Sequence, residues 1–418
     1  MKDQELEKKE EEKQKEEKQK KESFNQEDLL RDQLKTGLEK EEKACQDLVQ
    51  KLYDHPEIGG EEYYAHDLLS SFLEDRGYEV DRHVSMETGF LAHGGKRGGK
   101  PKILIPAEFD ALPEIGHGCG HNLFGGTSIL AFLSLAPLME DLGAELLLAG
   151  TPAEENLGGK IKMVDQGIFQ GVDAALMIHP GTENSLGSAS SALYPLKFEF
   201  FGKSAHGCKA AEGASALDPA VLTYLSINMQ RQFIKEGSFI HGIIKEGGKA
   251  ANVIPDYASM EYYFRADTLD EAKKMGEEAK KRAEMNAKAC GCTLKTSIYE
   301  CIYGETILNE KLADLMKEEF IRQGREDVKD LDFKPTGSTD VGAVSYLCPT
   351  VQATIKIAEP EEAKGHSREL AQATVSSQGF KALKDGALII GGTALKLVLD
   401  PSLLEECQKE EKGKLAKE

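Results

Sequence analysis

The sequence has no tryptophan, no apolar run close to the roughly 18 residues of a membrane span, and no regular spacing of cysteines. The first residues also lack the apolar segment of a secretory signal, so we expect no such signal. The eight cysteines lie at irregular intervals, which is typical of a reducing compartment rather than a disulfide framework. Together these absences predict a cytoplasmic protein.

Basic residues are too few for a protein that binds polyanions. Lys and Arg number 52 against 72 Asp and Glu, which gives a formal net charge of −20. A surface of this charge repels phosphate groups. We therefore expect neither nucleic acid nor a membrane as a partner, whereas a cationic substrate would be tolerated.

The chain is long enough for two domains with large cores, at 418 residues of which 40% are hydrophobic and 30% charged. Residues 1–24 are almost entirely Lys, Glu and Gln and predict a charged tail, disordered or loosely helical, before a helix that starts at residues 25–28. Residues 401–418 predict a second charged tail.

Three short apolar runs each lead into polar residues. Such runs are typical of a parallel sheet buried on both faces, and ligands bind beyond the carboxyl ends of its strands. We therefore expect these polar residues to meet at one edge, where their types suit a metal-dependent hydrolase. The runs and the residues that follow them are 103–105 with Glu108 and Asp110, 146–149 with Glu154 and Glu155, and 174–178 with His179.

Between residues 194 and 300 the pattern changes to half-exposed strands and two amphipathic helices, at 216–232 and 269–289. This pattern predicts a small α+β domain at 193–304, inserted into the larger domain. The larger, catalytic domain would then comprise 25–192 and 305–400, the latter part including a helix at about 370–399. The expected fold class is α/β with a mostly parallel sheet.

Cys119 and His121 flank a glycine, so two soft donors can reach one site. Taken alone, a buried inert cysteine beside a core histidine is the more common situation, and an acidic pair such as Glu154-Glu155 usually lies on a surface. The occurrence of such residues at the ends of three predicted strands favours a functional site over these separate explanations. His117 is left out of the expected ligands.

Ten short stretches, in order between about residues 45 and 398, make the sequence resemble the M20 metallopeptidases, in the amidohydrolase branch. Within that branch the stretches from His241 and Tyr262 resemble the β-alanyl-lysine (Xaa-Arg type) dipeptidase subgroup. The ten are Glu108-Phe-Asp-Ala-Leu-Pro, Gly116-His-Gly-Cys-Gly-His-Asn, Gly150-Thr-Pro-Ala-Glu-Glu, Gly158-Gly-Lys, His179-Pro, Gly202-Lys-Ser-Ala-His, Asn252-Val-Ile-Pro, Phe264-Arg, Gly337-Ser-Thr-Asp and Gly365-His.

The resemblance implies a three-layer, zinc-peptidase-like catalytic domain and an inserted, ferredoxin-like domain that serves as a lid or dimerisation domain. It also implies a role for each matching residue. Glu154 would be the general base and Asp110 would orient ligands, while Asn252 and Arg265 would bind substrate. His206 would reach the active site of a partner subunit, which implies a homodimer joined through the inserted domain. Two divalent metal ions per subunit would be held by Cys119, His121, Glu155, His179 and His366.

Two departures from the family pattern concern the site. Glu108 stands where many branches have a ligating histidine, and Cys119 would compensate. The residues after His206 are larger and more polar than expected, which leaves the substrate contact open.

Several functions remain open. Dipeptides, with a basic C-terminal residue first, precede N-acyl amino acids and aminobenzoyl-glutamate as candidate substrates. A catalytically silent binding or assembly protein is the alternative class, and the presence of Glu154 and His366 argues against it. Thiolate favours Zn²⁺, while carboxylate and imidazole also suit Mn²⁺ or Co²⁺.

Overall fold

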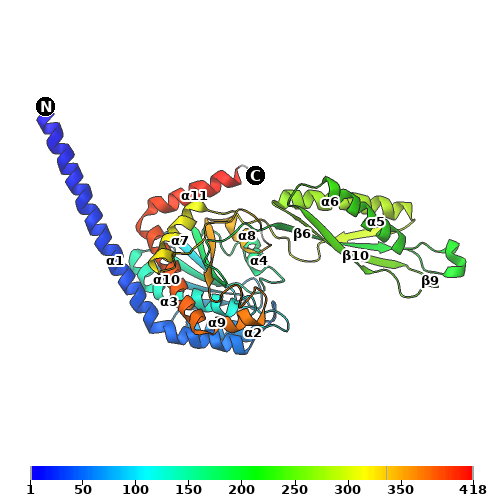
Figure 1. Ribbon diagram of the computed structural model, residues 1–418, viewed down its shortest axis with the longest axis horizontal. Helices are drawn as coiled ribbons and strands as arrows, with labels where there is room; N and C mark the ends of the chain where they lie inside the picture. Colours follow the sequence, from blue (N-terminus) through cyan, green and yellow to red (C-terminus); the bar gives the residue numbers. More distant parts are fainter. Residues whose placement is uncertain (1, 336, 417–418) are drawn as a thin grey trace.

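A computed structural model describes the backbone of residues 2–335 and 337–416, and the side chains of these residues from residue 26 onward. Two separate sheets organise the chain, one of six strands and one of four. In Figure 1 the helices α3 (His121–Leu142), α7 (Glu310–Arg322) and α10 (Ser377–Leu399) lie together on one side of the larger sheet. The helices α5 (Leu217–Gln230) and α6 (Leu269–Ala289) pack on the smaller sheet at the other end of the molecule. In the described part of the chain, each sheet packs against its own set of helices.

The six-stranded sheet has the order β1-β2-β4-β3-β5-β12. β3 runs parallel to both β4 and β5, and β12 runs parallel to β5, whereas β1 and β2 form an antiparallel edge. The mostly parallel sheet predicted from the apolar runs is confirmed. The strands are β1 Glu79–Arg82, β2 Phe90–Gly95, β3 Lys102–Ala107, β4 Glu145–Gly150, β5 Ala174–Gly181 and β12 Thr350–Lys356.

Both faces of this sheet are buried, because successive side chains of β3 point into different cores. Ile103 and Ile105 join the main core, whereas Leu104 joins a second cluster with Met163 and Val344. Helices α1, α3 and α10 contribute to the first core, and α4 and α8 to the second, which makes three layers. Their bounds are α1 Lys2–Asp54, α3 His121–Leu142, α4 Gly159–Asp165, α8 Val341–Ser345 and α10 Ser377–Leu399.

The four-stranded antiparallel sheet has the order β11-β6-β10-β8, with α5 and α6 packed on one face. Its chain order of strand, helix, two strands, helix and strand is that of a ferredoxin-like domain. The expected boundaries at residues 193 and 304 stay predictions. The elements are β6 Ala192–Phe201, α5 Leu217–Gln230, β8 Phe239–Glu246, β10 Tyr257–Ala266, α6 Leu269–Ala289 and β11 Thr293–Ser297.

Two short strands and two turns of 3-10 helix complete this region. β7 (Ala205–His206) pairs with β9 (Val253–Ile254), and β9 lies at the end of the molecule farthest from the large sheet (Figure 1). The 3-10 turns are η1 (Gly207–Glu212), which follows β7, and η2 (Arg231–Phe233) after α5.

Both ends of the described chain are helical, as the loosely helical alternative for residues 1–24 allowed. α1 begins at Lys2 rather than at residues 25–28, since Lys, Glu and Gln are good helix formers and no Gly or Pro interrupts them. After residue 400 the chain forms α11 (Pro401–Leu415), with Leu404 and Cys407 buried in the main core. Residues 401–415 are thus a packed helix, not a tail.

The helix expected at about 370–399 is broken into α9 (Arg368–Thr374) and α10. Ser376 lies between them and its hydroxyl accepts a hydrogen bond from Gly379 N at 3.0 Å, which is an N-terminal cap for α10. The remaining helices are α2 (Tyr63–Glu74) and α7 (Glu310–Arg322).

By length and composition, α3 is apolar enough to cross a membrane, and so is the pair α10 and α11 if its 100° bend is disregarded. However, 94% of the apolar window of α3 is buried inside the molecule. This burial is what a core helix packed on a sheet shows, so the length of α3 is weak support for a membrane span.

Candidate metal centre and active site

The Cys119–His121 segment turns sharply at the start of α3. Gly120 has φ of 93°, in the left-handed region, and a Cβ there would lie 2.5 Å from Cγ of Pro180. Glycine is therefore required both for the turn and for the close approach to β5. The turn places donor atoms of Cys119 and His121 within 4.8 Å of one another and of His179, at the end of β5.

The turn that carries Glu154 and Glu155 follows β4 and is fixed by a buried carboxylate. Ala153 has φ of 59°, a strained value for a residue with a side chain. The fully buried Glu62 accepts a hydrogen bond from Ala153 N at 2.7 Å. Burial raises the pKa of the Glu62 carboxyl to about 7, against the effect of its hydrogen bonds. Glu62 thus fixes the turn, a role that the sequence did not reveal.

His366 joins the site from the loop before α9. Its backbone N–H donates to the carbonyl of Gly118 at 3.0 Å, and its Nε2 lies 3.4 Å from Oε1 of Glu155. Among the described residues, three overlapping groups of donors lie within 4.8 Å of one another. These groups are Cys119 with His121 and His179, Cys119 with Glu155 and His366, and His121 with Glu154 and Glu155.

Two donor atoms in this cluster fit a bound cation. His121 Nε2 and Glu155 Oε1 are buried and make no hydrogen bond, although charged neighbours lie within 3.4 Å. On the other side of the ring, His121 Nδ1 lies 2.8 Å from Asp110, whose second oxygen accepts the Glu155 N–H at 3.0 Å. A carboxylate on Nδ1 orients the imidazole so that Nε2 faces the metal.

The charges of the cluster also favour a cation. Burial would lower the pKa of His121, but the surrounding Cys119, Asp110 and Glu108 raise it well above its usual value. Burial raises the pKa of the Cys119 thiol to about 12 and lowers that of His179 to about 4. A neutral imidazole is the form that binds metal, and a divalent cation would offset the cost of ionising the thiol.

These groups open into a cleft of about 550 Å³, whose lining includes Cys119, Glu154, Glu155, His179 and His366. Arg265 reaches the cleft wall, since its Nη1 donates to Oγ of Ser338 at 2.7 Å.

The structure does not bring His206 and Asn252 to this cleft. Both are exposed and lie side by side on the inserted domain, where Gly207 N donates to Asn252 O at 2.7 Å. His117 also lies outside the donor groups, with its Nε2 3.1 Å from the carbonyl of Leu52.

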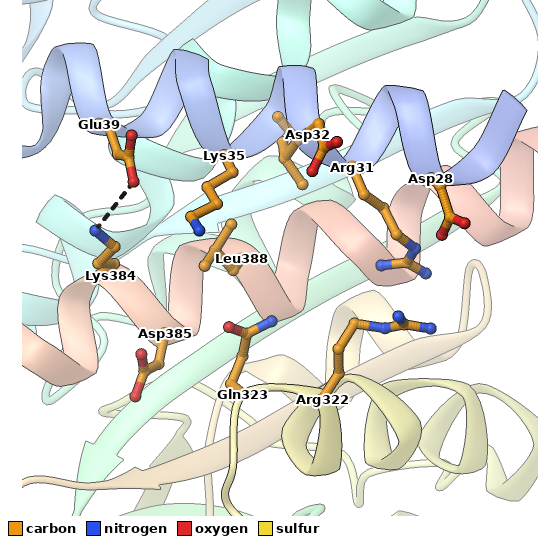
Figure 2. A pocket seen from close by; sticks show the side chains of 11 residues that line it. Asp28, Arg31, Asp32, Lys35, Glu39, Arg322, Gln323, Lys384, Asp385 and Leu388 are labelled. Atoms are coloured by element: carbon orange, nitrogen blue, oxygen red, sulfur yellow. Dashed lines mark ion pairs between the residues drawn. The ribbon is translucent and has the colours of Figure 1, made fainter. Parts of the chain in front are cut away.

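A second hollow, of about 720 Å³, is wider than the cleft but has different chemistry. Figure 2 shows acidic and basic side chains of α1, α7 and α10 facing one another across it, with an ion pair between Glu39 and Lys384. Among the described residues, no His or Cys lines it. This hollow is a groove between helices with charged side chains on both sides.

Comparisons with known proteins agree with this picture. Residues 192–289 match the model of a peptidase dimerisation domain of the M20 type. The chain is 33% identical over 387 residues to the Xaa-Arg dipeptidase of Mus musculus, with 89% of each chain covered. The chain belongs to the M20 metallopeptidase family. As an M20 protein it is a metal-dependent amide hydrolase, and the predicted family and enzyme class are confirmed.

Other M20 relatives are more distant. One of the subunits of the p-aminobenzoyl-glutamate hydrolase of Escherichia coli is 28% identical over 452 residues, covering 89% of this chain and 93% of its own. A solved Bacillus subtilis structure, described as a dinuclear metal binding peptidase from the M20 family, has a TM-score of 0.60 at 19% identity. It covers 84% of this chain and 98% of its own, and confirms the fold.

Cys119, like His121 and Glu155, belongs to two of the three donor groups, so its loss should affect metal binding directly. We expect Cys119→Ala to lose bound metal and activity together, measured as metal per subunit by mass spectrometry and as amide hydrolysis. Cys348→Ala removes another buried thiol that belongs to none of the donor groups, and should keep its metal. Full metal content in Cys119→Ala would contradict the assignment.

Proposed function

We propose that this M20 enzyme hydrolyses dipeptides whose C-terminal residue is cationic, of the Xaa-Arg or Xaa-Lys type. The observation that carries the proposal is an acidic wall, a group of acidic side chains that line the same cleft as the metal-binding side chains. This wall contains Glu183, Asp330 and Asp332, with Lys329 as its basic residue.

Most charges on this wall are already paired. Glu183 pairs with Lys329, and Asp330 with Lys317, whereas no ion pair involves Asp332 among the described residues. One oxygen of Asp332 accepts the backbone N–H of Lys334 at 2.9 Å. The carboxylate is thus oriented and remains able to bind a guanidinium or ammonium group.

This wall distinguishes two substrate classes among the relatives. The mouse relative is named for dipeptides ending in arginine, and the Escherichia coli relative for aminobenzoyl-glutamate. A substrate with a glutamate moiety would bring a further carboxylate to a wall that is already negative, which is unfavourable. An arginine or lysine side chain complements it.

In the proposed reaction Glu154 is the general base. Burial, with Glu108 and Asp340 nearby, raises the pKa of Glu154 to about 8, and the Thr339 hydroxyl donates to its Oε1 at 2.8 Å. A base whose pKa lies near the working pH can take a proton from water and deliver it to the leaving amine. Two divalent ions held by the five ligands would activate the water and stabilise charge on the oxyanion.

The identity of the metal is a further proposal. One thiolate and three imidazoles favour Zn²⁺, and the carboxylate allows Mn²⁺ or Co²⁺.

A cytoplasmic location is also proposed. The eight cysteines are all free of disulfides, which supports the reducing, cytoplasmic location expected from the sequence.

We also propose a homodimer joined through the inserted domains. Exposed apolar side chains gather on α5 and the neighbouring edge strand β8, among them Met229 and Phe239, which are 63% and 60% exposed. An unpaired strand edge beside an apolar helix face is a surface that another chain covers. His206 would then complete the site of the partner subunit, because it lies far from its own cleft.

Glu154→Gln keeps the size of the side chain but removes its basicity. We expect turnover to fall by about two to four orders of magnitude with metal content unchanged, since the five ligands remain. Hydrolysis of a dipeptide and metal analysis on the same sample test this. Loss of metal would show that Glu154 ligates and that Glu155 is the base.

Asp332→Asn should raise KM for Xaa-Arg and Xaa-Lys dipeptides about tenfold, the scale of one hydrogen bond between charged groups. KM for Xaa-Ala should change little, and aminobenzoyl-glutamate should remain a poor substrate. The control is Asp330→Asn, whose carboxylate is already engaged by Lys317. A wild-type preference for aminobenzoyl-glutamate over basic dipeptides would refute the proposed specificity.

His206→Ala should lower kcat by roughly a hundredfold or more, as for removal of one oxyanion donor, with metal content unchanged. Mixing it with Glu154→Gln subunits should restore part of the activity, because some mixed dimers contain one complete site. Mixing Glu154→Gln with the double variant His206→Ala/Glu154→Gln gives no complete site and serves as the control. If labelled subunits exchange but no activity returns, His206 does not act in the partner subunit.

A further inference from the structure

A lysine lies fully buried behind the metal-binding residues. Lys160, in the first turn of α4, is 0% exposed and does not line the cleft, so substrate does not reach it. Its Nζ lies 2.6 Å from Glu108 Oε1 and 2.6 Å from Asp340 Oδ1, and both of these carboxylates are also 0% exposed. A buried ammonium between two buried carboxylates is costly to assemble unless its partners are held in place.

One of these carboxylates leads to a metal-binding side chain. Oε2 of Glu108 lies 3.2 Å from Nε2 of His121, while Oε1 is held by Lys160. Lys160 therefore keeps Glu108 turned so that it borders the imidazole instead of moving into the cleft.

The other carboxylate leads to the general base. Asp340 accepts two bonds from Lys160, one from Nζ and one from the backbone N–H at 2.9 Å. The adjacent Thr339 donates its hydroxyl to Glu154 Oε1 at 2.8 Å. The position of the Glu154 carboxylate thus depends on a segment that is anchored to Lys160.

We infer that Lys160 is a positioning residue for the hydrolytic centre, acting on His121 through Glu108 and on Glu154 through Asp340 and Thr339. The inference rests on the proposed role of Glu154 and extends it to the residues that hold that side chain. Ligands and base would then share one anchor, although they come from different segments of the chain.

The contacts that lead from Lys160 to Glu154 can be tested separately from those that lead to His121, in the full-length enzyme. Thr339→Val removes only the hydroxyl that reaches Glu154, and should lower kcat about tenfold with KM and metal content unchanged. Lys160→Met removes the ammonium group that holds both Glu108 and Asp340. It should lower kcat and weaken metal binding, each by roughly 10- to 100-fold, as loss of an outer hydrogen-bond partner does. Metal binding is measured as metal retained after dialysis against a chelator.

A compensating variant separates positioning from simple packing. Lys160→Met/Glu108→Gln removes one of the two carboxylates left unpaired, and should regain part of the metal binding that Lys160→Met loses. Lys162→Met, on the same helix, is the matched control and should behave as wild type. Circular dichroism and thermal melting identify variants that do not fold.

Wild-type metal retention and kcat in a folded Lys160→Met would overturn the inference, as would an unchanged kcat in Thr339→Val. If Lys160→Met does not fold, Thr339→Val and the double variant decide. Metal retention does not depend on the substrate, so failure of the wild type to cleave any dipeptide would refute the proposed function alone.

Discussion

The structure depends on pairing the charges of buried side chains at the carboxyl ends of its parallel strands. Glu108, Asp110, His121, Lys160 and Asp340 are all 0% exposed. Each would be unfavourable without an opposite charge or a hydrogen-bond partner, since burial removes water that would otherwise solvate it. The apolar layers on both faces of the sheet exclude solvent from these side chains. The core that stabilises the fold therefore also strengthens the electrostatic interactions of the site.

These pairings also connect distant parts of the chain. Glu108 follows β3, Lys160 lies in the first turn of α4 and Asp340 precedes α8, so two ion pairs join three segments beside the cleft. Glu62 similarly ties the segment before α2 to the turn after β4. Removing one partner would leave the other buried and unpaired, which couples the geometry of the ligands to the stability of the body around them.

Local patterns in the sequence were sufficient to predict part of the site. Glu154, Glu155 and His179 directly follow apolar strands, and the placement of Cys119 and His121 depends on one glycine between them. His366 lies in a loop that no local pattern connects with these strands, and only the family resemblance indicated it. Lys160 and Asp340 belong to two of the stretches shared with the family, but their buried ion pair could not be predicted. A lysine and an aspartate 180 positions apart in sequence both normally indicate surface.

The ends of the chain show a related limit. Lys- and Glu-rich composition predicts charge and helix propensity, but it does not show whether a helix has a partner. α11 is held by contacts that only the tertiary structure supplies. Glu410 accepts the backbone N–H groups of Glu310 and Lys311, at 2.8 and 2.9 Å, where α7 begins. A carboxylate from another segment thus caps the start of α7.

The lining of the cleft comes from two parts of the structure, namely the large sheet with its flanking turns and the junction with the inserted domain. The metal-binding residues project from strands and turns of the large sheet and its flanks, so their geometry does not require the inserted domain. The lining of the cleft also includes residues 188–190, which lie just before β6, and Ser338, which accepts a hydrogen bond from Arg265 of β10 and donates to Ser191 O at 2.7 Å. The lining thus contacts the inserted domain, from which none of the five proposed ligands comes. Ligand geometry and substrate fit can accordingly vary independently, which is consistent with relatives that share the fold but are named for different amide substrates.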